Sequence, residues 1–265
     1  MADRGGRSER VEEVRSYYSR ILPFYELETT GRSDLGLWRR LARRWKPRRI
    51  LELGAGLGRV MAVLAREAPS VVGIDISFEM LSRASARLAA TGPRLVGGDM
   101  RELPFARAFD LVIAPSDPFS HLTSSADRRA ALRGVAKTLT PDGRFVLDAL
   151  YWRSSASQRS RRLALPEGTL MVRESWRPLA KKDLWNARYR YRWRQEEGIR
   201  EAEAEFTARS WNPATIRDLF DSCGLIIQHV WGTFSGGRFT RRSRRLIVVA
   251  RPARFMQGRG DRARE

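Results

Sequence analysis

The chain has 265 residues and a formal net charge of +20, with 50 Lys and Arg against 30 Asp and Glu. Its two histidines and one cysteine, Cys223, exclude an internal disulfide framework and argue against a dedicated metal site. No apolar run approaches the roughly 18 residues of a transmembrane helix, and the N-terminal MADRGGRSER lacks a signal-peptide core, so we expect a cytoplasmic protein without a membrane span.

Arginine carries most of the positive charge and is spread along the whole chain, with local clusters at residues 39–49, 159–162 and 238–245. These clusters have two interpretations, a solvated surface or a site for an acidic partner or polyanion. No RRM or KH motif is visible, so we favour the solvated surface over nucleic-acid binding. The oligomeric state stays open.

The N-terminal 46 residues precede the first predicted strand. Residues 1–10 are polar and rich in glycine and charge, which predicts disorder. Residues 11–27 (VEEVRSYYSRILPFYEL) have a helical pattern that we expect Pro23 to break, and they concentrate the aromatic residues Tyr17, Tyr18, Phe24 and Tyr25. Residues 35–45 alternate apolar and arginine at helical spacing, which predicts a second helix.

Residues 50–58 (ILELGAGLG) predict a strand, a tight turn and the start of a helix. Each of the three glycines, Gly54, Gly56 and Gly58, has a possible role. A glycine can adopt a positive φ in the turn, let the backbone approach a ligand closely, or let the helix start close to the sheet. A second apolar strand, VVGID, ends at Asp75 about 20 residues later, where an acid in nucleotide-binding folds accepts hydrogen bonds from a ribose. The alternative is that Asp75 only caps the next helix.

Strands and helices alternate over residues 50–150. The predicted strands are 50–53, 71–75, 94–96, 109–114 and 143–150, and the helices are 57–67, 78–90 and 126–139. Apolar strands between amphipathic helices predict a doubly wound parallel sheet of the α/β class, with its ligand beyond the carboxyl ends of the strands.

Five motifs in order resemble the motifs of class I S-adenosylmethionine-dependent methyltransferases, which have a Rossmann-like seven-stranded sheet. They are ELGAGLGRV, VVGIDIS followed by Phe78, Glu79 and Met80, GGDMRELPF, FDLVIAPSDPFSHL and LTPDGRFVLDAL. A dinucleotide site would have the spacing G-x-G-x-x-G. Glu52, just before the glycines, suits a ligand with a cationic end better than a pyrophosphate.

The resemblance implies S-adenosyl-L-methionine as cofactor and a role for each matching position. Gly54, Ala55, Gly56 and Gly58 form the turn under the methionine part of the cofactor, with Glu52 on the amino-acid side. Asp75 binds the ribose hydroxyls. The adenine is bound by Ile76, Met80, Asp99 and Met100, and the methionine side is lined by Ala114 and Pro115.

The second half of the chain predicts an antiparallel β insert and the end of the sheet. Residues 151–168 are rich in Ser and Arg, which predicts a surface connection. Period-two alternation predicts insert strands at 169–177, 184–195 and 199–209, with cross-strand Arg–Glu pairs. The segment YRYRWRQ could also be a platform on which nucleic-acid bases stack, but we favour an exposed sheet face with ordinary cross-strand pairs. A last helix follows at 212–223, then strands at 225–231 and 244–251.

This layout resembles small-molecule N-methyltransferases that act on amino sugars and glycine, in which the insert roofs the active site. It implies a helical lid after a disordered tail within residues 1–46, and a methyltransferase domain over 47–265. The insert spans about 168–210, between strand 5 and the last helix, and a disordered tail begins at about 253. The other interpretation of the N-terminal helix is simple packing on the sheet.

The resemblance also implies two catalytic candidates. His121 follows the fourth strand and matches a proposed base, and Tyr17 or Tyr18 matches a lid tyrosine; we choose Tyr17. The alternative is that His121 is structural, as we expect for His229. SDPF is a poor match to the D/N-P-P-Y/F motif of amino-methyltransferases. The alternative role for Asp117 is to attract a cationic amine substrate.

The predicted function is transfer of a methyl group from S-adenosylmethionine to a small-molecule amine or hydroxyl. The first alternative is an RNA or ribosomal-protein methyltransferase that uses the basic surface. The second is a non-catalytic protein that binds the cofactor and regulates a partner. A continuous basic face around the site would favour the first alternative.

Overall fold

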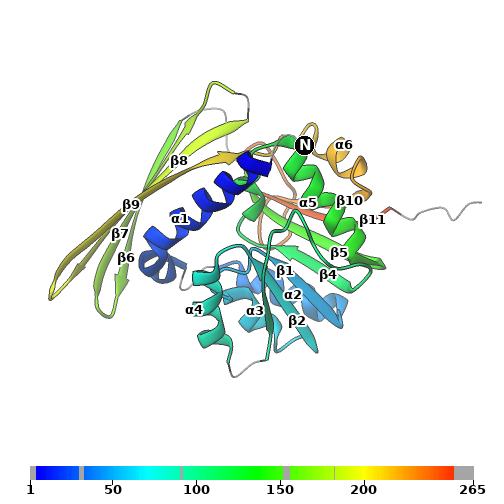
Figure 1. Cartoon of the computed structure of the whole chain (residues 1–265), viewed down its shortest axis with the longest axis horizontal. Coiled ribbons are helices and arrows are strands. Elements are labelled where there is room, and N and C mark those ends of the chain that lie inside the picture. Colours follow the sequence, from blue (N-terminus) through cyan, green and yellow to red (C-terminus); the bar gives the residue numbers. More distant parts are fainter. Residues whose placement is uncertain (1–3, 30–32, 90–91, 152–155, 182, 254–265) are drawn as a thin grey trace, which may run out of the picture.

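The computed structural model describes residues 4–29, 33–89, 92–151, 156–181 and 183–253 (Figure 1). Seven strands form one sheet in the order β10-β11-β5-β4-β1-β2-β3, in which only β11 runs antiparallel to its neighbours, β5 and β10. The sheet therefore has the predicted α/β Rossmann-like order. Its strands are β1 (Arg49–Leu53), β2 (Ser70–Asp75), β3 (Arg94–Gly97), β4 (Phe109–Ala114), β5 (Leu139–Leu150), β10 (Leu225–Trp231) and β11 (Arg245–Pro252).

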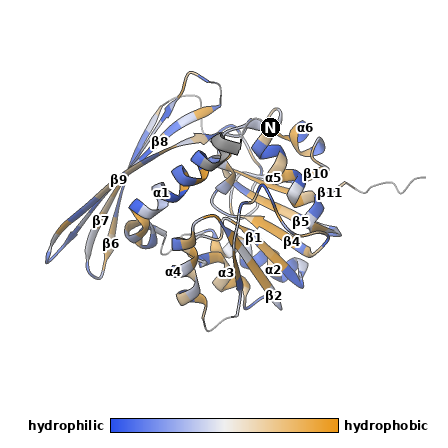
Figure 2. Cartoon of the chain, in the orientation of Figure 1, coloured by the Kyte–Doolittle hydropathy of each residue, from blue (hydrophilic) through white to orange (hydrophobic). Residues whose placement is uncertain are grey.

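Helices cover both faces of this sheet because its central strands are apolar on both sides, as their colour in Figure 2 shows. Alternate residues of β1 divide between the faces: Ile50 packs with α2 (Leu35–Trp45), α3 (Arg59–Leu64) and α4 (Phe78–Leu88), whereas Leu51 and Leu53 pack with α5 (Ser125–Thr138) and α6 (Ile216–Asp221). The helices α3 and α6 are shorter than the predicted 57–67 and 212–223.

The N-terminal helix α1 (Arg4–Thr29) is one continuous element through Pro23. The prediction that Pro23 breaks it was wrong, and residues 4–10 are helical rather than disordered; residues 1–3 lie outside the described part. Tertiary packing outweighs the loss of one backbone hydrogen bond, because Ile21, Leu22 and Phe24 around the proline are buried. No helix among the described residues is both long and apolar enough to cross a bilayer.

The insert between β5 and α6 is a separate four-stranded antiparallel sheet that projects from the main body (Figure 1). Its strands are β6 (Ser157–Leu165), β7 (Gly168–Pro178), β8 (Leu184–Gln195) and β9 (Gly198–Arg209). The prediction of a surface connection at 151–168 was wrong for its second half. Residues 157–165 pair with β7 along their whole length, although their own sequence is mostly Arg and Ser. Cross-strand pairing, rather than local apolarity, decides this element.

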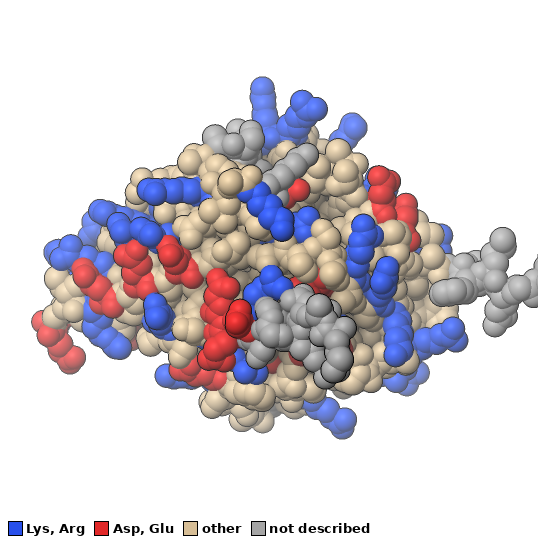
Figure 3. Space-filling view, turned by 45° about the horizontal axis from the view of Figure 1, so that its top comes forward, with Lys and Arg blue, Asp and Glu red and all other residues tan. Residues whose placement is uncertain are grey.

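The two faces of the insert differ. The inner face packs against α1 with large apolar groups, among them Trp176, Tyr191 and Phe206. The outer face has the predicted cross-strand pairs Arg188–Glu205, Arg190–Glu203 and Arg192–Glu201. Figure 3 shows acidic and basic side chains side by side at the left, over the insert. Exposed pairs of this kind contribute little to stability, so the inner face holds the insert in place.

A buried ion cluster fastens α1 to the insert. Glu28, 4% exposed near the end of α1, accepts a hydrogen bond from the Tyr191 hydroxyl at 2.7 Å. The Arg161 guanidinium on β6 contacts both Glu28 and Glu174. One arginine thus neutralises two carboxylates, and removal of that arginine would leave them uncompensated.

We therefore expect Arg161→Leu to destabilise the protein by about 3 kcal/mol, because the buried Glu28 and the part-buried Glu174 lose the cation that they share. The measurement is the urea midpoint followed by tryptophan fluorescence. Arg162→Leu, on the same strand with its side chain exposed, is the matched control and should leave the midpoint within about 0.5 kcal/mol of the parent. Equal effects of the two substitutions would contradict a structural role for the cluster.

Candidate functional site

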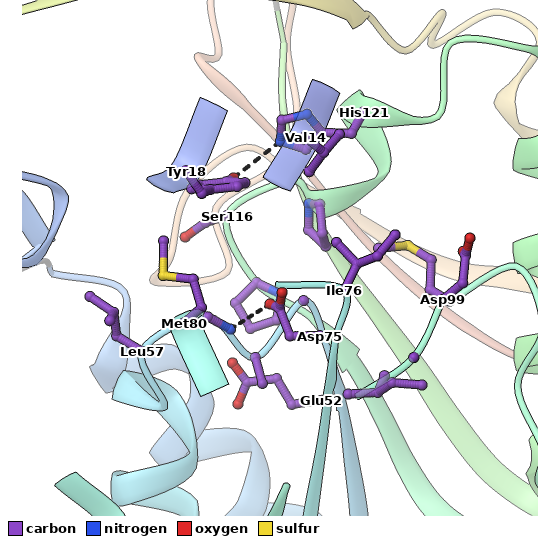
Figure 4. A pocket seen from close by; sticks show the side chains of 18 of the residues that line it. Val14, Tyr18, Glu52, Leu57, Asp75, Ile76, Met80, Asp99, Ser116 and His121 are labelled. Atoms are coloured by element: carbon purple, nitrogen blue, oxygen red, sulfur yellow. Dashed lines mark hydrogen bonds between the residues drawn. The ribbon is translucent and has the colours of Figure 1, made fainter. Parts of the chain in front are cut away.

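A cavity lies over the carboxyl ends of β1, β2 and β4, where the strand order of the sheet reverses, and α1 covers it (Figures 1 and 4). Parallel α/β sheets bind ligands at this position. Its walls come from the turn after β1, the ends of β2 and β3, the segment after β4 and one side of α1. Figure 4 shows Tyr18 and His121 at one end, Asp75 and Met80 in the middle and Glu52 at the other end.

The glycine turn after β1 forms one wall of the cavity. Gly54 has φ +69° and Gly56 has φ +51°, which non-glycine residues rarely adopt. A Cβ on Gly54 would lie 2.7 Å from the Pro118 ring, so that glycine admits a neighbouring loop. A Cβ on Gly56 would meet no protein atom within 4 Å. Gly56 therefore leaves space for a ligand.

Gly58, the third glycine, has a packing role. It has φ +70°, and a Cβ there would lie 2.8 Å from Leu88 of α4. Gly58 does not line the cavity, and neither does Ala114, which is fully buried at the end of β4. The other ten predicted cofactor residues all line it.

Asp75 lies at the end of β2 with its carboxylate fixed by the backbone. One oxygen accepts from the Gly56 amide at 2.7 Å, and the other accepts from the Ser77 amide at 2.8 Å. Burial raises the pKa of Asp75, and these two amides oppose the rise. The helix cap is Ser77, whose hydroxyl accepts from Met80. Asp75 is therefore not the cap, and its remaining lone pairs face the cavity.

Glu52 is a buried carboxylate whose Oε2 has no hydrogen-bond partner among the described residues. Burial raises its pKa well above the ordinary value of a glutamate. Arg59, a cation that also lines the cavity, is already engaged by Asp34 through two hydrogen bonds of 2.7 and 2.8 Å. An unsatisfied buried acceptor beside a cavity fits a ligand that brings a positively charged donor.

The end of β3 contributes an ion chain. Asp99 accepts from the Arg101 amide at 2.9 Å and from its guanidinium at 2.8 and 2.5 Å. Arg101 also pairs with Asp127 of α5 at 3.2 Å. Asp99 is thus oriented by a residue that the motif GGDMRELPF contains but that sequence analysis left unassigned.

His121 ends the short 3-10 helix η1 (Pro118–His121) after β4, and its Nε2 lies 3.1 Å from the Tyr18 hydroxyl. Burial lowers the pKa of His121 to about 4, so the ring is neutral at physiological pH. Tyr17, the tyrosine that we chose, does not line the cavity. It packs against Phe206 with ring centroids 4.7 Å apart and lies 6.3 Å from the His121 ring, whereas Tyr18, the next residue of the helix, contacts His121 through its hydroxyl.

Asp117 does not face the cavity either. It is 2% exposed and its carboxylate bonds within the protein, so it cannot attract a substrate directly. His229, which we expected to be structural, lies on β10, where it is exposed and stacks on Trp231. Sequence analysis missed other cavity residues that come from α1, from the start of α3 and from loops: Arg10, Val11, Val14, Thr29, Arg59, Ser116 and Leu122.

A second cavity adjoins the first at His121. Arg10, Val14 and His121 line both cavities, and the second one extends to Glu13 on α1 and to Phe206 on β9. It therefore runs between α1 and the insert. Among the described residues, no three His, Cys, Asp or Glu side chains are grouped closely enough to hold a metal ion.

Taken together, the first cavity fits a nucleoside with a cationic amine. Asp75 presents acceptors suited to a ribose diol, Ile76 and Met80 supply apolar contact for a base, and the Glu52 acceptor suits an ammonium group. The open space at Gly56 lies between these groups along the turn.

Comparisons with known proteins agree with this geometry. Residues 50–143 match the family model described as a methyltransferase domain. The chain is 27% identical over 207 residues to the cypemycin N-terminal methyltransferase of a Streptomyces species, covering 76% of this chain and 82% of that one. It is 33% identical over 142 residues to a dTDP-3-amino-3,6-dideoxy-alpha-D-glucopyranose N,N-dimethyltransferase of Streptomyces fradiae, covering 50% and 54%.

Among solved structures, the amino pentose methyltransferase CalS10 of Micromonospora echinaspora, determined with bound S-adenosylmethionine, superposes with a TM-score of 0.72. The match covers 87% of this chain and 96% of that one at 22% identity. This likeness shows a shared fold.

Proposed function

We propose that this chain, whose residues 50–143 match a methyltransferase domain, is a class I S-adenosylmethionine-dependent methyltransferase that transfers a methyl group to an amine of a small molecule, a hydroxyl being the second choice of acceptor. The observation that carries the proposal is the pairing of the Asp75 carboxylate, fixed by the Gly56 amide, with the unpartnered Glu52 acceptor in one cavity. The relatives named above as N-terminal and N,N-dimethyltransferases support nitrogen as the acceptor atom.

The cofactor is S-adenosyl-L-methionine, and the residues present suit its two ends. We assign the ribose hydroxyls to Asp75, the adenine to Ile76, Met80, Asp99 and Met100, and the amino group to Glu52. Gly54, Ala55, Gly56 and Pro115 line the space between. Gly58 and Ala114 act indirectly, through packing of α3 and β4.

The cofactor supplies a methyl group on a positively charged sulfur, which needs no further activation. The protein must place the acceptor in line and exclude water. With the cofactor bound, the residues of the cavity would hold the acceptor nitrogen with its lone pair directed at that methyl group. α1 covers the cavity and would limit the access of water.

His121 and Tyr18 lie where the two cavities meet, and we assign them to the acceptor nitrogen. A neutral His121 accepts a hydrogen bond from an amine N–H and orients the nitrogen lone pair toward the cofactor side. The acceptor would enter through the second cavity, where Glu13 attracts a cationic amine and Phe206 gives apolar contact.

The two alternative functions, an RNA or ribosomal-protein methyltransferase and a non-catalytic cofactor-binding protein, have less support. Positive charge does not form one continuous face in Figure 3, where acidic side chains interrupt it over the insert. The cavity lining is mixed as well, with Arg10, Arg59 and Arg101 among four carboxylates. A non-catalytic cofactor-binding protein does not require the His121–Tyr18 pair at the junction of two cavities.

Isothermal titration of the purified protein with S-adenosylmethionine, S-adenosylhomocysteine and NADH tests the proposal. We expect micromolar binding of the first two ligands and none of NADH, because the cavity matches an adenosine with an amino-acid end rather than a pyrophosphate. Binding of NADH alone would refute the assignment. A panel of amines, amino sugars and short peptides, with S-adenosylhomocysteine formation as readout, then identifies the acceptor.

A further inference from the structure

Asp117 is a buried carboxylate that the proposed reaction does not use. It is 2% exposed and begins the η1 turn with φ +59°, in the left-handed region. Its carboxylate has two donors from different parts of the chain: Oδ2 accepts from the Leu150 amide at 3.1 Å, and Oδ1 accepts from the Trp211 indole at 3.2 Å.

Leu150 and Trp211 are the two roots of the insert. Leu150 is the last residue of β5, where the chain leaves the main sheet for β6. Trp211 is the second residue after the end of β9, at the point where the chain returns to the main body. A single carboxylate therefore holds the exit and the return of the insert, which are 61 positions apart in the sequence, at one point.

The same residue closes the turn that carries His121. The Asp117 carbonyl accepts from the Ser120 amide at 3.0 Å and from the Ser120 hydroxyl at 2.7 Å. His121 is the next residue. Its ring packs on Phe206 of the insert, with ring centroids 4.5 Å apart. His121 is thus positioned by the turn beneath it and by the insert beside it, and Asp117 bonds to both.

Arg128 of α5 reinforces this connection. Its guanidinium lies 4.2 Å from the Trp211 ring and donates to the carbonyls of Arg209, Ser210 and Leu122. Leu122 directly follows His121. The charged groups around Asp117 are therefore Arg128 and, on β5, Asp148, which is paired with Arg245 of β11 at 2.6 Å.

The carboxylate is not explained by stability. Burial raises the pKa of Asp117 to about 6, despite the nearby Arg128. A carboxyl whose pKa is higher in the folded than in the unfolded state favours folding when protonated, and this contribution is lost as the pH rises through about 6. At neutral pH the ionised Asp117 is thus unfavourable for folding, so its role is better sought in the geometry that it fixes.

We propose that Asp117 is a positioning residue that ties both roots of the insert to the His121 turn, so that the roof of the active site and His121 keep one relative position. This inference rests on the proposed function for its catalytic meaning, but the tie itself is independent of the cofactor. Loss of the tie should loosen the contact between His121 and Phe206 and let water reach the imidazole.

The test is NMR of ¹⁵N-histidine-labelled protein, in which His121 and His229 give the only two imidazole signals. The variants are Asp117→Asn, which has one acceptor for two donors, and Trp211→Phe, which removes the indole donor and keeps the ring. In both variants we expect the titration midpoint of His121 to rise by about one pH unit or more, because a hydrated ring regains its charge more easily. His229, on β10, is the internal reference.

Asp110→Asn is the matched control, since the Asp110 carboxylate, like that of Asp117, accepts from two donors, here the backbone amides of Arg48 and Arg49, but at the opposite end of the strands. It should leave the His121 titration unchanged. A His121 titration in both test variants identical to the parent would overturn the proposal. If Asp117→Asn does not fold, Trp211→Phe decides alone.

Titration with S-adenosylmethionine separates this inference from the proposed function. We expect the two test variants to bind the cofactor within about threefold of the parent, because neither residue lines the cofactor cavity. Failure of the parent to bind would refute the proposed function and leave the His121 result standing. Loss of binding only in the variants would show that the tie supports the cofactor cavity instead, and would overturn the assignment to His121.

Discussion

Replacing Gly56 with valine is expected to weaken S-adenosylmethionine binding by about 100-fold or more, while the protein still folds. A valine side chain would enter the space that no protein atom occupies within 4 Å of the Cβ position. That space lies in the cofactor cavity, so the ligand and the side chain compete for it. A 100-fold loss corresponds to about 2.7 kcal/mol of binding free energy, which isothermal titration measures directly.

The backbone strain of this substitution needs its own control, because valine is unfavourable at a positive φ wherever it stands. Gly92→Val supplies it. Gly92 has φ +74°, an exposed position and no atom within 4 Å of its Cβ site, and it lies outside the cavity. Both variants should lose similar stability and only Gly56→Val should lose binding. Equal affinities for the two would refute the assignment of the turn. Gly54→Val is less informative, because its side chain would clash with Pro118 and disturb the protein itself.

Cofactor binding is expected to release a proton from Glu52. Burial raises the pKa of this carboxyl, so in the free protein it binds a proton more tightly than an exposed glutamate does. A cationic ammonium next to Oε2 favours the ionised form and lowers that pKa. The affinity should therefore rise with pH, by up to about tenfold per pH unit below the pKa of the free protein.

Calorimetry in buffers of different ionisation enthalpy measures this proton release. Glu52→Gln should abolish it and weaken binding by about 10- to 100-fold, because an amide replaces a charged acceptor. In the free protein, the contribution of Glu52 to folding stability changes with pH in the opposite direction to the cofactor affinity. The raised pKa means that Glu52 favours folding at low pH and that this contribution is lost as the pH rises, so Glu52→Gln should be the more stable protein under alkaline conditions. Unchanged proton release in the variant would exclude Glu52 as the source.

The sheet and most of its helices could be predicted from sequence because their signals are local. Apolar strands that end in glycine or acid, such as the one ending at Asp75, specify both the element and the ligand edge. The failures have non-local causes. Pro23 is tolerated because packing on the insert holds α1 together, and β6 is a strand because β7 offers it a partner.

The cofactor half of the site was predictable for the same reason, since its residues follow strand ends. The acceptor half was not. Tyr17 and Tyr18 are neighbours in sequence and only the rotation of α1 decides which one meets His121. The bonds of Asp117 join positions up to 94 residues apart, and no motif encodes such a contact.

The way α1 is fastened has a kinetic consequence. To the insert it is held by the buried Glu28 cluster and an aromatic face. To the sheet side it is held by the Arg15 donation to the Ile76 carbonyl and by the half-exposed Arg87–Glu26 pair. On the sheet side α1 also packs the buried Leu22 against Leu57 and Met80. Because α1 covers the cofactor cavity, we expect cofactor exchange to require α1 to part from these sheet-side contacts, while Asp117 keeps the roots of the insert at the His121 turn. Opening of α1, rather than methyl transfer itself, would then limit how fast spent cofactor is exchanged.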